Sequence, residues 1–134
     1  MGNKKVLIVD DDKDFLNELG EVLSFAGYDM VSVDVPLEVM NVLEKDKVDL
    51  ILLDLNMPGK NGFNLAFDLS NSRHFKNIPI IAMTGFNKIE INSLLELCGV
   101  RKCLKKPFRP LDIISEIENM LKGMESEKDK VYDV

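Results

Sequence analysis

Short apolar runs alternate five times along this chain with longer stretches of helical periodicity. The runs are rich in Val, Ile and Leu, and they end in acidic or turn-forming residues. Runs of this length predict strands, and apolar residues spaced three and four apart predict amphipathic helices. Strands that alternate with helices favour a parallel sheet whose right-handed crossovers place helices on both faces. The sequence therefore predicts a doubly wound five-stranded α/β domain.

The expected strands and helices follow one another without an internal break. Strands are expected at residues 6–9, 28–33, 48–53, 78–83 and 102–105. Helices are expected between them, and the last helix carries the apolar residues Leu111, Ile114, Ile117 and Leu121. The third run is apolar on both faces apart from Asp49, which predicts a strand in the middle of the sheet.

Size and composition narrow the class of protein. The chain has 134 residues, enough for one domain with its own core. Its net charge of -6 argues against direct nucleic-acid binding, which needs a basic surface. Two cysteines without metal-binding spacing indicate a reducing setting. No apolar run has the length of a membrane span or of a signal peptide. We therefore expect a cytoplasmic protein that does not bind membranes.

The ends of the chain differ in composition from the rest. We expect the folded domain to cover residues 4–122. Residues 123–134 are mostly charged, which predicts a loose tail or the stub of a linker.

Five polar residues fall where the expected strands end. They are Asp10 and Asp11 after the first strand, Asp54 after the third, Thr84 after the fourth and Lys106 after the fifth. Each of these residues, taken alone, could have an ordinary structural role. The neighbouring Asp12, for example, could simply cap the following helix, since Asp is a favoured N-cap residue. The carboxyl ends of parallel strands, however, meet at one edge of a sheet, where ligands bind. We therefore expect all five side chains to line one crevice.

The chemistry of this set favours a metal ion and a phosphoryl group. Two carboxylates about 4 Å apart repel each other by several kcal/mol at a protein surface, and a hard cation such as Mg²⁺ or Mn²⁺ relieves this. Lys106 offers a point charge and Thr84 a hydroxyl for phosphate oxygens. An aspartate can itself be the nucleophile that forms an aspartyl phosphate. Positioning and charge neutralisation would then drive an in-line displacement.

Four short motifs resemble the receiver domain of bacterial two-component response regulators. They are Leu7-Ile8-Val9-Asp10-Asp11-Asp12, Leu52-Leu53-Asp54-Leu55-Asn56-Met57-Pro58-Gly59, Met83-Thr84-Gly85 and Lys105-Lys106-Pro107-Phe108. The motifs occur in the family's order and spacing, and the resemblance covers about residues 4–122. It implies the strand order 2-1-3-4-5. It also implies a signalling switch that assists its own phosphorylation and dephosphorylation and is not a multiple-turnover enzyme.

The resemblance also implies which residues accept the phosphoryl group and bind the metal. Asp54 would be the phosphorylated residue. Asp11, Asp54 and the main-chain carbonyl of Asn56 would bind Mg²⁺, with Asp10 in support.

Further implications concern the phosphoryl oxygens and the partners. Thr84 would donate a hydrogen bond to a phosphoryl oxygen and Lys106 would pair with one, while the peptide bond before Pro107 would be cis. The phosphoryl donor would be a phosphohistidine on a sensor histidine kinase or a histidine phosphotransfer protein. Phosphorylation would change the face formed by the fourth helix, fifth strand and fifth helix, which would bind a downstream protein that the sequence does not identify.

Two positions bear on how such a switch would work. The family usually has Tyr or Phe three residues before the lysine, and here that residue is Cys103. The usual coupling between the threonine and an aromatic ring is therefore in question. Phe86, two residues after Thr84, lies where the family tunes dephosphorylation, and its bulk predicts shielding of the acyl phosphate from water.

Three alternative functions remain. Cys103 leaves open a degenerate receiver that binds partners without phosphorylation. A haloacid-dehalogenase-type phosphatase would use Asp10 as nucleophile and Asp12 as acid, but Lys13-Asp14 departs from that family's pattern. A flavodoxin-like nucleotide carrier would need a phosphate-cradling loop after the first strand, where this chain has an acidic run that repels phosphate.

Overall fold

The computed structural model describes residues 2–57, 62–85 and 88–132. The strands are β1 Lys5–Val9, β2 Asp29–Val33, β3 Leu50–Asp54, β4 Ile80–Thr84 and β5 Lys102–Lys105. The helices are α1 Lys13–Phe25, the short 3-10 helix η1 Pro36–Glu38, α2 Val39–Lys45, α3 Gly62–Ser70, α4 Lys88–Leu97 and α5 Pro110–Tyr132. The predicted alternation of strands and helices is confirmed, and the predicted strands lie within two residues of the observed ones.

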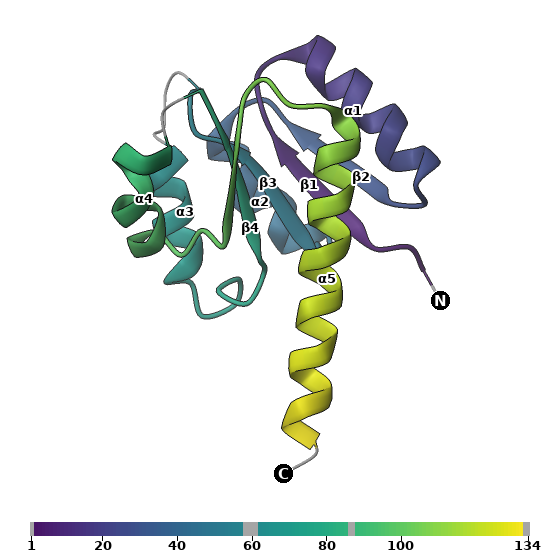
Figure 1. The fold of residues 1–134 in the computed structure, drawn as a ribbon, viewed down its shortest axis with the longest axis vertical. Coiled ribbons are helices and arrows are strands. Elements are labelled where there is room, and N and C mark those ends of the chain that lie inside the picture. The colour runs from purple at the N-terminus through teal and green to yellow at the C-terminus, as the bar shows by residue number, and fades with distance from the viewer. Residues whose placement is uncertain (1, 58–61, 86–87, 133–134) are drawn as a thin grey trace.

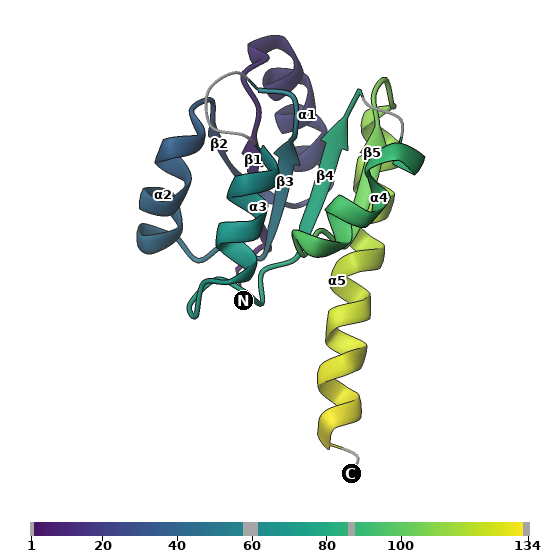
Figure 2. The ribbon, with the colours of Figure 1, turned by 90° about the vertical axis from the view of Figure 1, so that its left-hand side faces the viewer.

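All five strands belong to one parallel sheet in the order β2-β1-β3-β4-β5. This is the order that the resemblance implied. Helices α1 and α5 cover one face, and α2, α3 and α4 cover the other (Figure 1, Figure 2). Because the strand order reverses direction across the sheet between β1 and β3, the carboxyl ends of these strands flank the point where ligands bind in folds of this class.

Two apolar cores hold the sheet between its helical layers. Successive residues of β1 alternate between them: Val6 and Ile8 pack with α1 and α5, and Leu7 and Val9 pack with the opposite layer. The strand β3 is buried along its whole length, as its continuous apolar run predicts. Complete burial of one such aliphatic side chain contributes about 1.5–3 kcal/mol relative to exposure. The cores therefore fix the register that positions the strand ends.

Only some of the apolar residues of α5 are buried. Leu111 is 69% exposed, whereas Ile113 is completely buried together with Ile117. At about 100° per residue, Leu111 lies about 200° from Ile113, on the far side of the helix. The apolar residues of α5 are therefore not all buried, because the phase of the helix against the sheet decides which of them face the core.

Residues 123–132 are helical. We expected a loose segment from residue 123, but α5 continues to Tyr132 and extends beyond the sheet (Figure 1). Its last turns are rich in Glu and Lys, which are good helix formers. Whether this segment acts as a tail or as a linker stub stays a prediction. Among the described residues, no helix, α5 included, has the length and apolar character to cross a membrane.

Two glycines that follow α1 and α4 adopt left-handed backbone conformations, and they differ in their surroundings. Gly27, after α1, has φ +90° and open space where a side-chain methyl group would lie. Gly99, after α4, has φ +76°, and a methyl group there would collide with the Ser70 side chain. The Ser70 hydroxyl donates a hydrogen bond of 2.7 Å to the carbonyl of Cys98, so it joins the ends of α3 and α4.

We predict that Gly99→Ala lowers the free energy of unfolding more than Gly27→Ala does. Both changes incur about 1–2 kcal/mol for a left-handed alanine. Gly99→Ala also displaces the Ser70 hydroxyl and its hydrogen bond, for about 1 kcal/mol more. Urea denaturation of the two variants beside the unchanged protein measures the difference. Equal losses would contradict the predicted collision.

Candidate functional site

The structure brings the predicted polar residues to one edge of the sheet. Asp10 directly follows β1, Asp54 and Thr84 are the last residues of β3 and β4, and Lys106 directly follows β5. The parallel register aligns these ends, since Asp54 pairs with Met83 and Thr84 pairs with Lys105. Asp10 and Thr84 are completely buried and Asp54 is 3% exposed. The parallel strand ends therefore bring Asp10, Asp54, Thr84 and Lys106 to the same edge of the sheet.

Three carboxylates lie close together in this crevice. Oxygens of Asp10, Asp11 and Asp54 all lie within 4.8 Å of one another, with Asp11 exposed at the mouth. Among the residues that the structure describes, no other three Asp, Glu, His or Cys side chains approach one another as closely. An all-oxygen donor set of this kind suits hard divalent cations. The cluster could therefore hold a metal ion.

Lys106 lies against the two buried carboxylates. Its Nζ atom is 3.2 Å from Oδ2 of Asp10 and 3.4 Å from Oδ2 of Asp54. The lysine side chain is 31% exposed, so it reaches the acids from the rim of the crevice. One ammonium group offsets only part of the charge of three carboxylates. A divalent cation would offset the remainder.

The pKa values of these groups reflect burial and mutual charge. Burial raises the pKa of Asp10 and the charge of Asp54 adds to this, while the backbone N–H of Asp12 and the ammonium of Lys106 act in the opposite direction. Burial works to lower the pKa of Lys106, but the carboxylates of Asp10 and Asp54 outweigh it and raise that pKa. The lysine therefore stays protonated at neutral pH. A neighbouring cation would favour the ionised form of Asp10.

The backbone orients both buried carboxylates in the same way. The N–H of Asp12 donates to Oδ1 of Asp10, and the N–H of Asn56 donates to Oδ1 of Asp54, each at 2.9 Å. Both contacts join an aspartate to the residue two positions later, as in an Asx turn. Each carboxylate therefore has one oxygen on the backbone and the other beside Lys106.

Hydrogen bonds also join the loops that carry the site. The Asn56 side chain accepts a hydrogen bond of 2.9 Å from the N–H of Gly85, and the carbonyl of Thr84 accepts one of 2.7 Å from the N–H of Lys106. Sequence reasoning considered only the main-chain carbonyl of Asn56 and missed this role of its amide. A polar side chain two residues after the buried acid was the only available signal.

Other expectations have clear outcomes. The Lys106–Pro107 peptide bond is cis, as expected. Asp12 caps α1, because its side chain accepts a hydrogen bond from the N–H of Phe15. Cys103 is buried in the core that includes Leu95 of α4, so a thiol occupies the place where the family usually has an aromatic ring. Phe86 and the Pro58–Gly59 part of the second motif lie outside the described residues.

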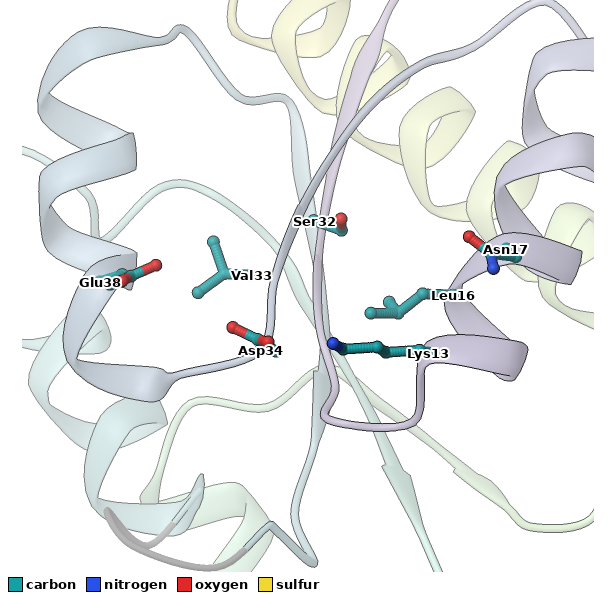
Figure 3. Close-up of a pocket in the computed structure, with 7 residues that line it drawn as sticks. All are labelled: Lys13, Leu16, Asn17, Ser32, Val33, Asp34 and Glu38. Atoms are coloured by element: carbon teal, nitrogen blue, oxygen red, sulfur yellow. The ribbon is translucent and has the colours of Figure 1, made fainter.

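A separate pocket lies between the start of α1 and the end of β2 (Figure 3). Its volume is about 320 Å³, and it is lined by Lys13, Leu16, Asn17, Ser32, Val33, Asp34 and Glu38. None of these residues belongs to the acid cluster, and the sequence motifs do not include them. The pocket therefore adds no group to the site described above.

Comparison with known proteins agrees with the geometry. Residues 6–118 match the family described as the response regulator receiver domain. The putative two-component response regulator ARR21 of Arabidopsis thaliana is 34% identical over 110 residues, which are 81% of this chain and 17% of that protein. The aerobic respiration control protein ArcA of Escherichia coli is 30% identical over 122 residues, which are 90% of this chain and 50% of that protein.

A solved structure has the same fold. The CheY-like response regulator receiver domain protein of Methanospirillum hungatei has a TM-score of 0.86 and 27% identity, over 94% of this chain and 99% of its own. The chain spans half the length of ArcA and 17% of the length of ARR21. Receiver domains are signalling modules and not multiple-turnover enzymes. From the match over residues 6–118 and the shared fold, this chain belongs to the response regulator receiver domain family of two-component signal transduction.

Proposed function

We propose that this receiver domain is a phosphorylation-dependent switch in which Asp54 accepts a phosphoryl group. The observation that carries the proposal is the position of the Asp54 carboxylate, which lies within 4.8 Å of the carboxylates of Asp10 and Asp11 and 3.4 Å from the Lys106 ammonium. At such a site, a metal ion held by the carboxylates and the Lys106 ammonium can both neutralise the negative charge of a phosphoryl group. Oδ2 of Asp54 attacks phosphorus in line, and the bond to the leaving group breaks with its electron pair on that group.

The choice of Asp54 over the other two acids rests on access and orientation. Asp10 is completely buried, which disfavours it as the nucleophile of a phosphatase-like mechanism. Asp11 is exposed at the mouth, and within the described part of the chain no backbone N–H orients its carboxylate as Asn56 orients that of Asp54. Asp54 combines an oriented carboxylate with some exposure to the crevice, which supports it as the acceptor.

The proposed cofactor is Mg²⁺, or Mn²⁺ in its place. Asp11, Asp54 and the main-chain carbonyl of Asn56 would hold it, with Asp10 in support. When bound, it would neutralise charge on the transferring phosphoryl group. Lys106 would turn from its carboxylate partners toward a phosphoryl oxygen, and the Thr84 hydroxyl would donate a hydrogen bond to another.

The proposed partners follow from the family. The donor would be a phosphohistidine on a sensor histidine kinase or on a histidine phosphotransfer protein, acting in the cytoplasm. Phosphorylation would shift an existing equilibrium in the face formed by α4, β5 and α5 and so change binding of a downstream protein. The domain would also assist its own phosphorylation and dephosphorylation. The buried thiol of Cys103, at the position of the family's usual aromatic ring, supports a second candidate function: a receiver that binds partners without phosphorylation.

We predict that incubation with a small phosphodonor and Mg²⁺ adds the mass of one phosphoryl group to the protein. Asp54→Asn should show no such gain, because the amide is a poor nucleophile. Asp34→Asn is the matched control, since Asp34 is an exposed aspartate after β2 that lies outside the acid cluster, and it should be modified normally. Intact-mass spectrometry reads all three proteins. Equal modification of Asp54→Asn would refute Asp54 as the acceptor.

We predict that Mg²⁺ raises the thermal unfolding midpoint, because a ligand that binds only the folded state stabilises that state. At a Mg²⁺ concentration of roughly 100 times the dissociation constant, the free energy of unfolding should rise by about 2.7 kcal/mol. Asp11→Asn should lose most of this rise, and in EDTA it should be at least as stable as the unchanged protein, because one of three like charges is gone. Glu44→Gln, which removes an exposed acid on α2, should keep the full response. A normal Mg²⁺ response in Asp11→Asn would exclude Asp11 as a ligand.

A further inference from the structure

An aromatic pair lies beside the lysine of the site. The Lys106 Nζ atom is 5.2 Å from the centroid of the Phe15 ring, within the range of a cation–π contact. The Phe15 ring also meets the ring of Phe108 edge to face, with centroids 5.8 Å apart and an interplanar angle of 71°. Phe15 comes from the first turn of α1 and Phe108 from the segment after β5. The ammonium thus has carboxylates on one side and a ring face on another.

The Phe15 ring is tied to the same turn that orients Asp10. The N–H of Asp12 donates to Oδ1 of Asp10, and the Asp12 side chain accepts from the N–H of Phe15 at 3.1 Å. The Lys106 ammonium links the same two residues directly, because it contacts both the Phe15 ring and Oδ2 of Asp10. Asp12 therefore sets the direction of the carboxylate and the start of the helix that carries the ring. Their relative position is fixed by one tight turn.

We propose that Phe15 is a positioning residue that holds the Lys106 ammonium in the crevice while its anionic partners change. The inference rests on the proposed role of Lys106 in phosphoryl transfer to Asp54. In the unphosphorylated site the ammonium is shared between two carboxylates. Once the Asp54 oxygen is phosphorylated, the lysine must exchange that partner for a phosphoryl oxygen. A ring face attracts the cation whichever oxygen it pairs with.

A ring is suited to this task for a physical reason. The lysine side chain is long, flexible and 31% exposed, so it has other solvated positions available at the rim. An aliphatic side chain at position 15 could fill the same volume but has no quadrupole to attract the ammonium. The edge contact from Phe108 holds the Phe15 ring in its orientation. The exposed ring of Phe25, 97% accessible on the same helix, provides a matched comparison without a neighbouring lysine contact in the described structure.

The test compares Phe15→Leu, Phe15→Tyr and Phe25→Leu with the unchanged protein. Trace acylation measures the reaction rate of the Lys106 amine by peptide mass spectrometry, relative to the exposed Lys47 as internal reference. Phosphorylation by a small phosphodonor with Mg²⁺ is followed separately. Phe15→Met supplies a second variant without a ring if the leucine variant does not fold.

Without the ring, we expect acylation of Lys106 to rise about two- to fivefold and phosphorylation to slow by a similar factor, as a partly exposed cation–π contact allows. Phe15→Tyr and Phe25→Leu should match the unchanged protein. Unchanged acylation in Phe15→Leu, or the same defect in Phe15→Tyr, would overturn the inference. If even the unchanged protein takes up no phosphoryl group, the proposed function fails, and the acylation ratio still decides whether the ring holds the lysine.

Discussion

The Lys106 ammonium, held between the carboxylates of Asp10 and Asp54, is the interaction on which the site depends. Without it, two buried like charges would face each other in a region that disfavours the ionised form. The lysine reaches them only because β5 ends beside β4, and β4 beside β3, in one parallel register. The apolar cores above and below the sheet maintain this register. Packing remote from the crevice therefore determines its electrostatics.

The loops add precision through backbone donors. Asp10 and Asp54 each accept a hydrogen bond from the residue two positions later, so the same local turn occurs after two adjacent strands. At the first of these turns Asp12 also caps α1, and at the second the Asn56 amide accepts from Gly85 in the loop after β4. The residues that end the strands thus start the helices and join the loops. The hydrogen bonds that shape this edge of the sheet are therefore the same ones that orient the carboxylates of the site.

Strand-end residues were predictable from the sequence because their position follows from topology alone. A continuous apolar run identifies a buried strand, and the acid after it must lie at the carboxyl edge. The phase of α5 was not predictable in this way, since both Leu111 and Ile113 are apolar and only packing against the sheet separates them. The Asn56–Gly85 hydrogen bond and the Phe15–Lys106 contact were also missed. Both join segments far apart in the chain through side-chain directions that no local pattern contains.

The thiol at Cys103 constrains how a signal could leave this edge. It is buried in the core beside α4, where a ring would otherwise couple to the threonine by changing its rotamer. A cysteine side chain is too short to make that movement over several ångströms. One connection between the crevice and β5 runs through the backbone, where the N–H of Lys106 donates to the carbonyl of Thr84. On the proposed function, displacement of Thr84 or Lys106 by a phosphoryl group would therefore act directly on the end of β5, and through it on the start of α5.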